Sequence, residues 1–227
     1  MAKYILLSEK SWHKTLFKNF KKKMCDDEWL LIDSKKEFNL ETLNNFKPSK
    51  IFIPHWSNII SREIFENYEC IVFHMTDLPF GRGGSPLQNL IASGHKNTKI
   101  SAIKVEEGID TGDIYLKRNL DLDGSAIEIF ERASLVIEDM ILEILQKNIT
   151  PIPQLGEVVE FKRRKPEDGD LCLIEDLDRV YDYIRMLDCE GYPRAFLKVN
   201  DIIYEFENAK FDSVNKIITA NVQIFKK

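Results

Sequence analysis

The sequence predicts an α/β protein: a Rossmann-like, mostly parallel sheet flanked by helices, followed by a small C-terminal α+β module. Three observations lead to this prediction. Short apolar runs alternate with segments of helical periodicity in the first third of the chain, a long amphipathic pattern follows in the middle, and strand-like runs dominate the end.

The first part of the chain alternates between strands and helices. Apolar runs rich in Ile, Leu, Phe and Val predict buried strands at residues 3–8, 28–33, 50–54 and 70–74. Apolar residues at helical spacing predict helices between them, at 12–20, 40–46 and 61–68. Strands joined through helices need crossover connections, which favour a parallel sheet covered on both faces.

Two further strands and a long helix follow. Strand-like runs occupy 99–105 and 113–122. Ser125 and Glu128 have the spacing of a capping box, so a helix should begin there and end near Asn148, before two prolines. Its apolar residues recur every three to four positions and predict one buried stripe: Phe130, Ala133, Ile137, Met140, Ile141 and Ile144.

The last third has a different texture. A strand runs into a charged loop over 158–170, a helix with an apolar face that begins at Leu177 covers 177–187, and alternating strands follow to the end. We therefore expect a catalytic domain over residues 1–156 and a small module over 157–227. The module should dock on the larger domain, because so short a segment buries little apolar surface by itself.

Composition limits the classes of function. The net charge is −5 and the pI about 5.5, which argues against a protein that grips nucleic acid through many phosphates. The dense basic run KNFKKK, residues 18–23, is interpreted as the solvated face of the first helix rather than as an RNA contact. Cys25, Cys70, Cys172 and Cys189 match no zinc spacing, and no metal site is expected. A reduced, cytoplasmic protein without a signal peptide or membrane span fits best.

The stretch HMTDLPFGRGGSPLQNLI, residues 74–91, is the most informative part of the sequence. His74 ends an apolar strand, and ligands of parallel α/β sheets bind beyond such strand ends. No G-x-G-x-x-G follows the first strand, so the dinucleotide-binding loop is missing. Asp110 lies in a glycine-flanked turn, EEGIDTGDIY. Each residue alone could be structural, but a His–carboxylate pair without a Ser or Cys nucleophile indicates general acid–base chemistry.

These two segments together resemble the 10-formyltetrahydrofolate-dependent formyltransferase family. The family pattern is Asn-x-His, Ser-Leu-Leu-Pro, Arg-Gly and a later Asp-x-Gly. His74, Leu78-Pro79, Arg82-Gly83 and 110–112 fall in register with it. FKRRKPEDGD and the stretch 181–196 also look like sugar-directed members, of the nonulosonic or pseudaminic acid type, and the central loop is similar to the formylation domains of peptide synthetases.

The resemblance implies roles for single residues. His74 would be the general base that deprotonates the acceptor amine, and Asp110 would orient its imidazole. N10-formyltetrahydrofolate would be the formyl donor. The segments expected to cradle it contain Asn58, Ile59, Ile60, Gly84, Glu106, Glu107, Gly108, Ile109 and Asp110.

Two positions depart from the family pattern. The family Asn falls at Val72, and Asp77 occupies a position that is apolar in the family. The first departure removes a carboxamide that would support the formyl oxygen. A substitute donor is therefore expected: a backbone N–H of the glycine-rich loop, an ordered water, or a side chain of 55–58, with Asn58 and Trp56 as the leading candidates.

The expected acceptor is a nucleotide-linked amino sugar, with a UDP-4-amino-4,6-dideoxy hexose as the specific guess. Nucleic acid and membrane are not expected as partners, and a homodimer remains open. Methionyl-tRNA formylation and a catalytically impaired folate-binding protein are the alternatives. Residues that could line the acceptor site, each with a structural explanation as well, are Ser8, Lys10, Trp12, His55, Trp56, Arg163 and Arg164.

Overall fold

The computed structural model describes residues 1–226, which form two compact units. The first comprises residues 1–82, 99–120 and 131–160, and the second comprises 83–98, 121–130 and the chain from 161 onward. The expected division into 1–156 and 157–227 stays a prediction.

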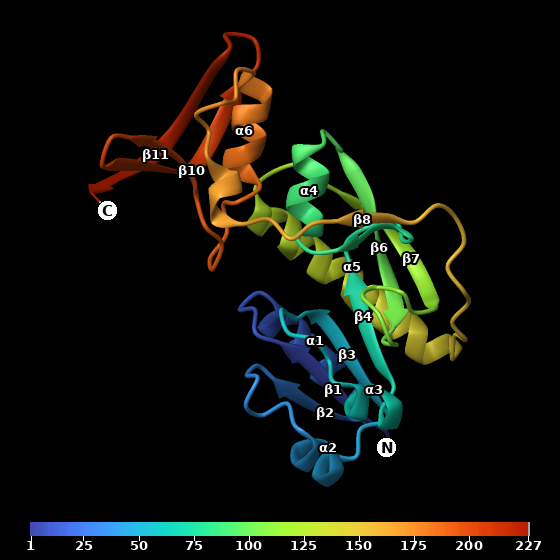
Figure 1. Ribbon diagram of the computed structural model, residues 1–227. Coiled ribbons are helices and arrows are strands. Elements are labelled where there is room, and N and C mark those ends of the chain that lie inside the picture. The colour runs from blue at the N-terminus through green and yellow to red at the C-terminus, as the bar shows by residue number, and fades with distance from the viewer. Residues whose placement is uncertain (227) are drawn as a thin grey trace. The chain divides into compact units, whose positions relative to one another are not determined.

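A six-stranded sheet forms the centre of the first unit (Figure 1). Its order is β2-β1-β3-β4-β6-β7, with β1 (Lys3–Ser8), β2 (Glu28–Ile32), β3 (Lys50–His55), β4 (Cys70–His74), β6 (Asn97–Lys104) and β7 (Ile114–Asp121). Strands β2, β1, β3 and β4 pair in parallel, and β4 pairs with β6 in antiparallel. The predicted mostly parallel sheet is confirmed.

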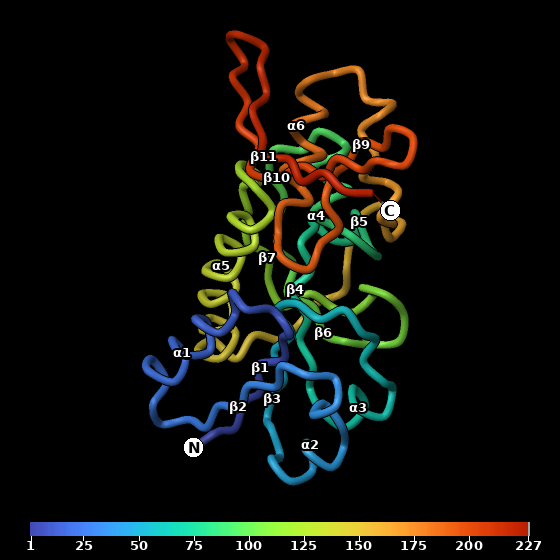
Figure 2. The backbone as a smooth tube through the Cα atoms, turned by 90° about the vertical axis from the view of Figure 1, so that its left-hand side faces the viewer, coloured from blue at the N-terminus to red at the C-terminus, as the bar shows by residue number. Residues whose placement is uncertain are grey.

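Helices α1 (His13–Lys23) and α5 (Ala126–Lys147) lie side by side over one face of this sheet (Figures 1 and 2). Phe20 of α1 stacks on Trp29 of β2, with ring centroids 4.5 Å apart. Asn19 of α1 donates a hydrogen bond to the Glu138 carboxylate of α5 at 2.8 Å. All six residues of the stripe predicted for α5 are buried. At the start of α5, the Glu128 carboxylate accepts hydrogen bonds from the backbone N–H and the hydroxyl of Ser125.

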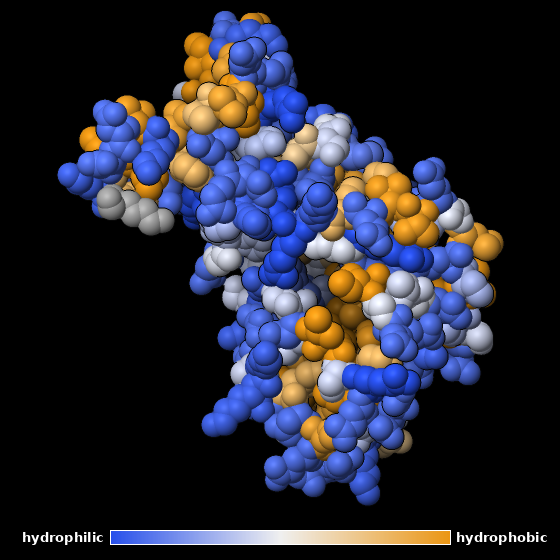
Figure 3. Space-filling model, viewed as in Figure 1, coloured by the Kyte–Doolittle hydropathy of each residue, from blue (hydrophilic) through white to orange (hydrophobic). Residues whose placement is uncertain are grey.

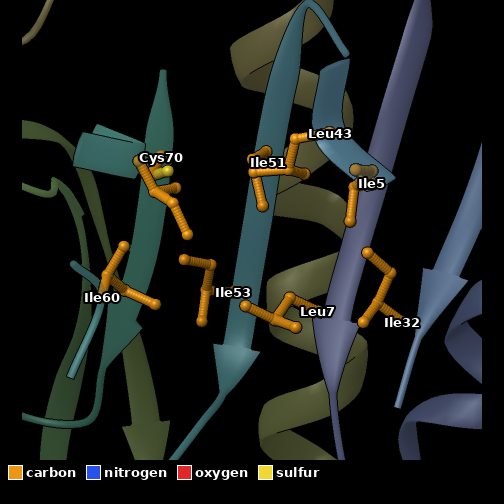
Figure 4. Close-up of a cluster of buried hydrophobic side chains, with 9 residues drawn as sticks. Ile5, Leu7, Ile32, Leu43, Ile51, Ile53, Ile60 and Cys70 are labelled. Atoms are coloured by element: carbon orange, nitrogen blue, oxygen red, sulfur yellow. The ribbon is translucent and has the colours of Figure 1, made fainter. Parts of the chain in front are cut away.

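The opposite face is covered by α2 (Leu40–Phe46) and α3 (Arg62–Asn67). Figure 4 shows the side chains of the parallel strands on this face, together with Leu43 of α2. These form one apolar cluster of buried residues: Ile5, Leu7, Ile32, Leu43, Ile51, Ile53, Ile60, Ile64 and Cys70. Both faces of the parallel strands are therefore buried, which explains why their sequences read as continuous apolar runs.

The second unit contains α4 (Pro86–Ala92), α6 (Leu177–Arg185) and an antiparallel sheet of order β11-β10-β9. The sheet consists of β9 (Ala195–Val199), β10 (Ile202–Asp212) and β11 (Ile217–Lys226). A short ladder of β5 (Phe80–Gly83) and β8 (Val159–Phe161) and one turn of 3-10 helix, η1 (Pro166–Gly169), complete the described elements.

Helix α6 differs from the predicted face. Leu177 is 40% exposed, whereas Arg185 is buried with Asp182, and the Nε–Oδ1 distance between them is 2.7 Å. Arg185 Nη1 also donates to the carbonyl oxygens of Leu122 and Gly124 at 2.6 and 2.7 Å. A paired cation that satisfies two backbone carbonyls can replace an apolar residue in such a position.

The β10–β11 hairpin mixes apolar and hydrophilic residues on its surface (Figure 3). Ile224 is 62% exposed, and Val222 and Phe225 are also exposed. Within the described chain, no helix is both long enough and apolar enough to cross a lipid bilayer.

Candidate active site

His74 stands at the carboxyl end of β4, where the apolar residues Cys70, Ile71 and Phe73 hold the strand in the core. Its side chain is buried, and Nε2 lies 2.8 Å from the carbonyl oxygen of Gly81. A carbonyl only accepts hydrogen bonds, so Nε2 carries a proton in this arrangement. Residues 74–81 therefore fold back on themselves, and the carbonyl of Gly81 holds the imidazole of His74 in place.

Asp110 is brought to the other ring nitrogen of His74. Its Oδ2 lies 3.5 Å from His74 Nδ1, and its side chain is largely buried. The backbone of Asp110 has a left-handed φ of 55°, in a turn that Gly112 presses against β6. A Cβ at Gly112 would approach the carbonyl oxygen of Lys104 to 1.8 Å, so only glycine fits there. The turn thus aims the carboxylate at the imidazole, while the chemical roles of the two residues stay proposals.

Gln154 and Arg82 join this pair, although the sequence did not single out either as a site residue. Gln154 Nε2 donates to the carbonyl oxygens of Asp110 and Gly112, both at 2.8 Å. Its Oε1 accepts from Arg82 Nε and Nη2 at 3.2 and 2.8 Å. The Arg-Gly of the motif marked Arg82, but no pattern in the sequence marked Gln154, because the contact exists only in the folded chain.

Asp77 is an anchor of the loop rather than part of the His–Asp pair. It lies 2.5 Å from Lys117 Nζ and 2.9 Å from Lys99 Nζ. Burial disfavours the charged carboxylate, but hydrogen bonds and charge from Lys117 and Lys99 outweigh it and lower the pKa of Asp77. Lys117 also donates to the carbonyl of Leu78. The polar residue at this position is thus explained by two lysines on neighbouring strands.

Val72 is half-buried on β4 and packs against an apolar cluster of Leu78, Ile103 and Ile114. Its surroundings suit a branched apolar side chain. The group that would replace the family Asn is still a matter of prediction.

Two of the segments expected to hold the donor, 58–60 and 106–110, come together in the first unit. Arg62 Nη1 lies 3.9 Å from Glu107 Oε2, which links the chain after Asn58 to the turn that carries Asp110. Ile60 is buried in the core, whereas Ile59 and Ile109 are 90% and 66% exposed. Two apolar side chains held in water on adjoining loops suit a partly apolar ligand.

Gly84 lies in the second unit, where its lack of a side chain has a local cause. A Cβ there would come within 2.6 Å of Arg163 Cβ. The Gly84 N–H donates to the carbonyl oxygen of Phe161 at 3.2 Å. The glycine therefore permits close packing against the chain after β8, and its part in donor binding is untested. In the same unit, the Arg164 guanidinium lies 5.2 Å from the centre of the Tyr183 ring.

Four of the expected acceptor residues gather where β1 and β3 end. Ser8 and His55 are paired across these strands, Trp12 meets His55 edge-on at 5.8 Å, and Lys10 Nζ lies 5.5 Å from the Trp12 ring centre. Ser8 is buried, and its hydroxyl lies 2.7 Å from Nδ1 of His13. The hydroxyl of Ser8 is thus used in a hydrogen bond within the protein.

His13 was missed by the sequence analysis. Burial, then the charges of His55 and Lys10, lower the pKa of His13 to about 3. Burial and Lys10 likewise lower the pKa of His55 to about 3. Both rings are neutral near pH 7. Trp56 does not join this group, because it packs against Phe38 at 5.9 Å.

Comparison with known proteins bears on the family and on the acceptor. The family model described as "Formyl transferase" matches residues 13–128, and "Methionyl-tRNA formyltransferase, C-terminal domain" matches 166–225. A solved structure described as methionyl-tRNA formyltransferase from Clostridium thermocellum is 52% identical, covers all of both chains and has a TM-score of 0.97. The methionyl-tRNA formyltransferase of Nitratiruptor sp. is 32% identical over 60% of this chain and 47% of its own length. The chain spans about half the length of the curated relatives it matches.

These findings contradict two expectations. A sugar N-formyltransferase from Shewanella sp. shares only 16% identity, with a TM-score of 0.69 over 88% of this chain and 94% of its own, which shows a common fold alone. The much more similar proteins are named for methionyl-tRNA. The expected nucleotide-linked amino sugar is therefore wrong, and so is the exclusion of nucleic acid as a partner. The net charge of the chain led to the wrong exclusion, because a charge summed over all residues does not describe the surface that binds a substrate.

The formyltransferase expectation is confirmed at the level of the family. The first family model spans just over half of the chain, and a relative with 52% identity covers the whole of it. The sheet that carries His74 and Asp110 has the predicted fold. The chain belongs to the formyl transferase family.

Proposed function

We propose that this protein transfers a formyl group from N10-formyltetrahydrofolate to the amino group of methionine on methionyl-tRNA. The observation that carries the proposal is the 52% identity, over the whole of both chains, with the methionyl-tRNA formyltransferase structure from Clostridium thermocellum. The match of residues 166–225 to the C-terminal domain of the same enzymes supports it independently.

The His74–Asp110 pair supplies the chemistry that such a transfer needs. An amine that attacks a formyl carbon gains positive charge as the new C–N bond forms, so it must lose a proton. His74 takes this proton and returns it to the donor nitrogen as the old C–N bond breaks, which is general acid–base catalysis. The Asp110 carboxylate, 3.5 Å from Nδ1, stabilises the positive charge on the imidazole in between.

The present contacts of His74 set a condition on this role. One ring nitrogen is bonded to the Gly81 carbonyl and the other faces Asp110. For the ring to reach an acceptor amine, it must exchange the Gly81 carbonyl for that amine. Because Nε2 carries the proton while it faces Gly81, this exchange also requires the Nδ1–H tautomer, in which Nδ1 donates to the Asp110 carboxylate and Nε2 is free to take the proton of the amine.

The loops around Ile59 and Ile109 would hold the donor, which supplies the formyl group. Their exposed apolar side chains would cover its ring system, and the 3.9 Å contact between Arg62 and Glu107 places the two loops next to each other. The turn 106–110 also carries Asp110, so its backbone groups would bind the donor next to the His74–Asp110 pair.

The test is an assay with N10-formyltetrahydrofolate that carries a labelled formyl group. Methionyl-tRNA is the acceptor, and free methionine and uncharged tRNA are the controls. We expect label on methionine released from the aminoacylated tRNA and none in either control. His74→Asn protein gives the background, and a wild-type signal no higher than this background would exclude the proposed function.

A further inference from the structure

Gln154 lies in a segment that is fixed by backbone hydrogen bonds on both sides of it. Before it, Ile152 exchanges two hydrogen bonds with Ile114 at the start of β7, at 2.8 and 3.0 Å. After it, the Val159 N–H donates to the carbonyl oxygen of Pro79 at 3.3 Å. The path of the segment therefore does not depend on the side chain of Gln154.

The side-chain amide of Gln154 uses both of its donors and both acceptor positions of its oxygen. The NH₂ group bonds the carbonyls of Asp110 and Gly112, and the oxygen accepts twice from Arg82. No substitution reproduces this set. A glutamate keeps the contact with Arg82 but turns a carboxylate oxygen toward two carbonyl oxygens.

Together with the contacts of His74, these hydrogen bonds form a closed network that contains the proposed catalytic pair. His74 bonds to Gly81, Gly81 is followed by Arg82, Arg82 bonds to Gln154, and Gln154 bonds to Asp110. The Asp110 carboxylate then faces His74 again. This network joins the loop after His74 to the turn of Asp110, and Gln154 is the residue that connects the two.

Asp110 needs such support, because a left-handed φ of 55° is unfavourable for a residue with a side chain. Holding the carbonyls of Asp110 and Gly112 fixes the peptide planes on both sides of Thr111, and thereby the direction of the Asp110 carboxylate. We propose that Gln154 is a positioning residue: it holds the turn of Asp110 so that the carboxylate faces Nδ1 of His74. This inference rests on the proposed formyl transfer, but not on the identity of the acceptor.

Gln154→Met and Gln154→Glu test the inference by kinetics. Both should lower kcat on the order of 10- to 100-fold, because a displacement of about 1 Å in a catalytic group can cost roughly 100-fold. KM for methionyl-tRNA should change little, whereas KM for the donor should rise if the turn 106–110 moves together with Asp110, whose carbonyl Gln154 holds. Gln146→Met, at an exposed position near the end of α5, is the matched control and should retain wild-type kinetics.

A double-mutant cycle separates positioning from a general structural effect. If Gln154 acts through Asp110, Gln154→Met should cost little more once Asp110→Asn is present. If Gln154 only stabilises the fold, the two losses should multiply. Independent, multiplicative losses, or Gln154→Glu with wild-type kcat, would overturn the inference.

A spectroscopic measurement keeps the test independent of activity. The chain contains only four histidines, so the His74 ring signals can be assigned in ¹H–¹⁵N spectra by their loss in His74→Asn. Gln154→Met should shift the His74 ring signals in the same sense as Asp110→Asn, and Gln146→Met should leave them unchanged. Unchanged His74 signals in Gln154→Met would contradict the positioning role. Absence of formyl transfer by the wild type would instead reject the proposed function.

Discussion

Nδ1 of His74 lies 3.5 Å from Oδ2 of Asp110, across a gap that a small movement of the ring would close to a full hydrogen bond. The two residues come from the end of β4 and from the segment after β6. The antiparallel register sets Lys104, the last residue of β6, opposite Ile71 near the start of β4, so the segment that follows folds back along β4 to bring Asp110 to His74. Substitution of either residue should therefore remove catalysis while leaving the sheet intact.

His74→Asn should lower kcat by about 10²–10⁴-fold, the range that general-base catalysis contributes. Asparagine stays polar but cannot take a proton near pH 7. Asp110→Asn should also lower kcat, because its amide cannot stabilise an imidazolium. Thermal unfolding of both variants is the control for folding. More than about a tenth of wild-type kcat in His74→Asn would show that another group is the base.

Val72→Asn should give little or no increase in kcat. The family Asn would support the oxygen of the formyl group, but an evolved enzyme without it needs another donor already in place. In addition, the amide would enter the apolar cluster of Leu78, Ile103 and Ile114, at a cost of about 1–3 kcal/mol in the free energy of unfolding. Steady-state kinetics and urea unfolding measure the two effects. A large gain in kcat would mean that the native protein leaves the oxygen without support.

The parallel strands and their helices could be predicted from the sequence because burial on two faces leaves a direct signature. The apolar runs at β1, β3 and β4 are such signatures, and the stripe of α5 is another. The strand-end position of His74 and the turn of Asp110 followed from the same pattern. Each of these features depends on residues that are close together in the chain.

Features that arise only between distant segments could not be predicted. Gln154 contacts Arg82 and Asp110 through tertiary structure, and an isolated glutamine after two prolines carries no pattern. Ser8 looked like a binding residue because its hydroxyl has no evident partner in the sequence. The turn of the chain after β1 brings His13 to this hydroxyl, and only the folded structure shows that turn. The acceptor was misassigned for a different reason: net charge and a short C-terminal module describe the whole chain, not the surface of a site.

Lys23→Met should destabilise the protein. Glu138 is 4% exposed, and its carboxylate is held by Lys23 at 2.6 Å and by Asn19 at 2.8 Å. Removing Lys23 leaves the buried Glu138 carboxylate with neutral Asn19 in place of a cation, so the free energy of unfolding should fall. Lys22→Met, at the exposed neighbouring position, is the control and should change stability by less than about 0.5 kcal/mol. Equal stabilities of the two variants would mean that water screens Glu138.

The free energy of unfolding should fall as the pH drops below about 6.5, the ordinary pKa of a histidine. The pKa of His13 is about 3 in the folded protein, so the unfolded chain binds a proton at mildly acidic pH while the folded protein does not. Neutral His13 thus contributes stability that is complete above pH 6.5 and is lost progressively toward pH 3. The loss amounts to about 1.4 kcal/mol for each pH unit and each such histidine.

His13→Asn isolates this contribution, because asparagine does not titrate and every other group is retained. His55, whose pKa is also about 3, and all carboxyl groups then affect both proteins alike. Urea unfolding between pH 7 and pH 4.5 should show a shallower pH dependence for the variant, by about 1.4 kcal/mol per pH unit below 6. The absolute stability of the variant at pH 7 should be lower, since Ser8 loses its partner at 2.7 Å. Parallel pH dependences for the two proteins would show that His13 takes up its proton in the folded state, in spite of its burial between Ser8 and His55.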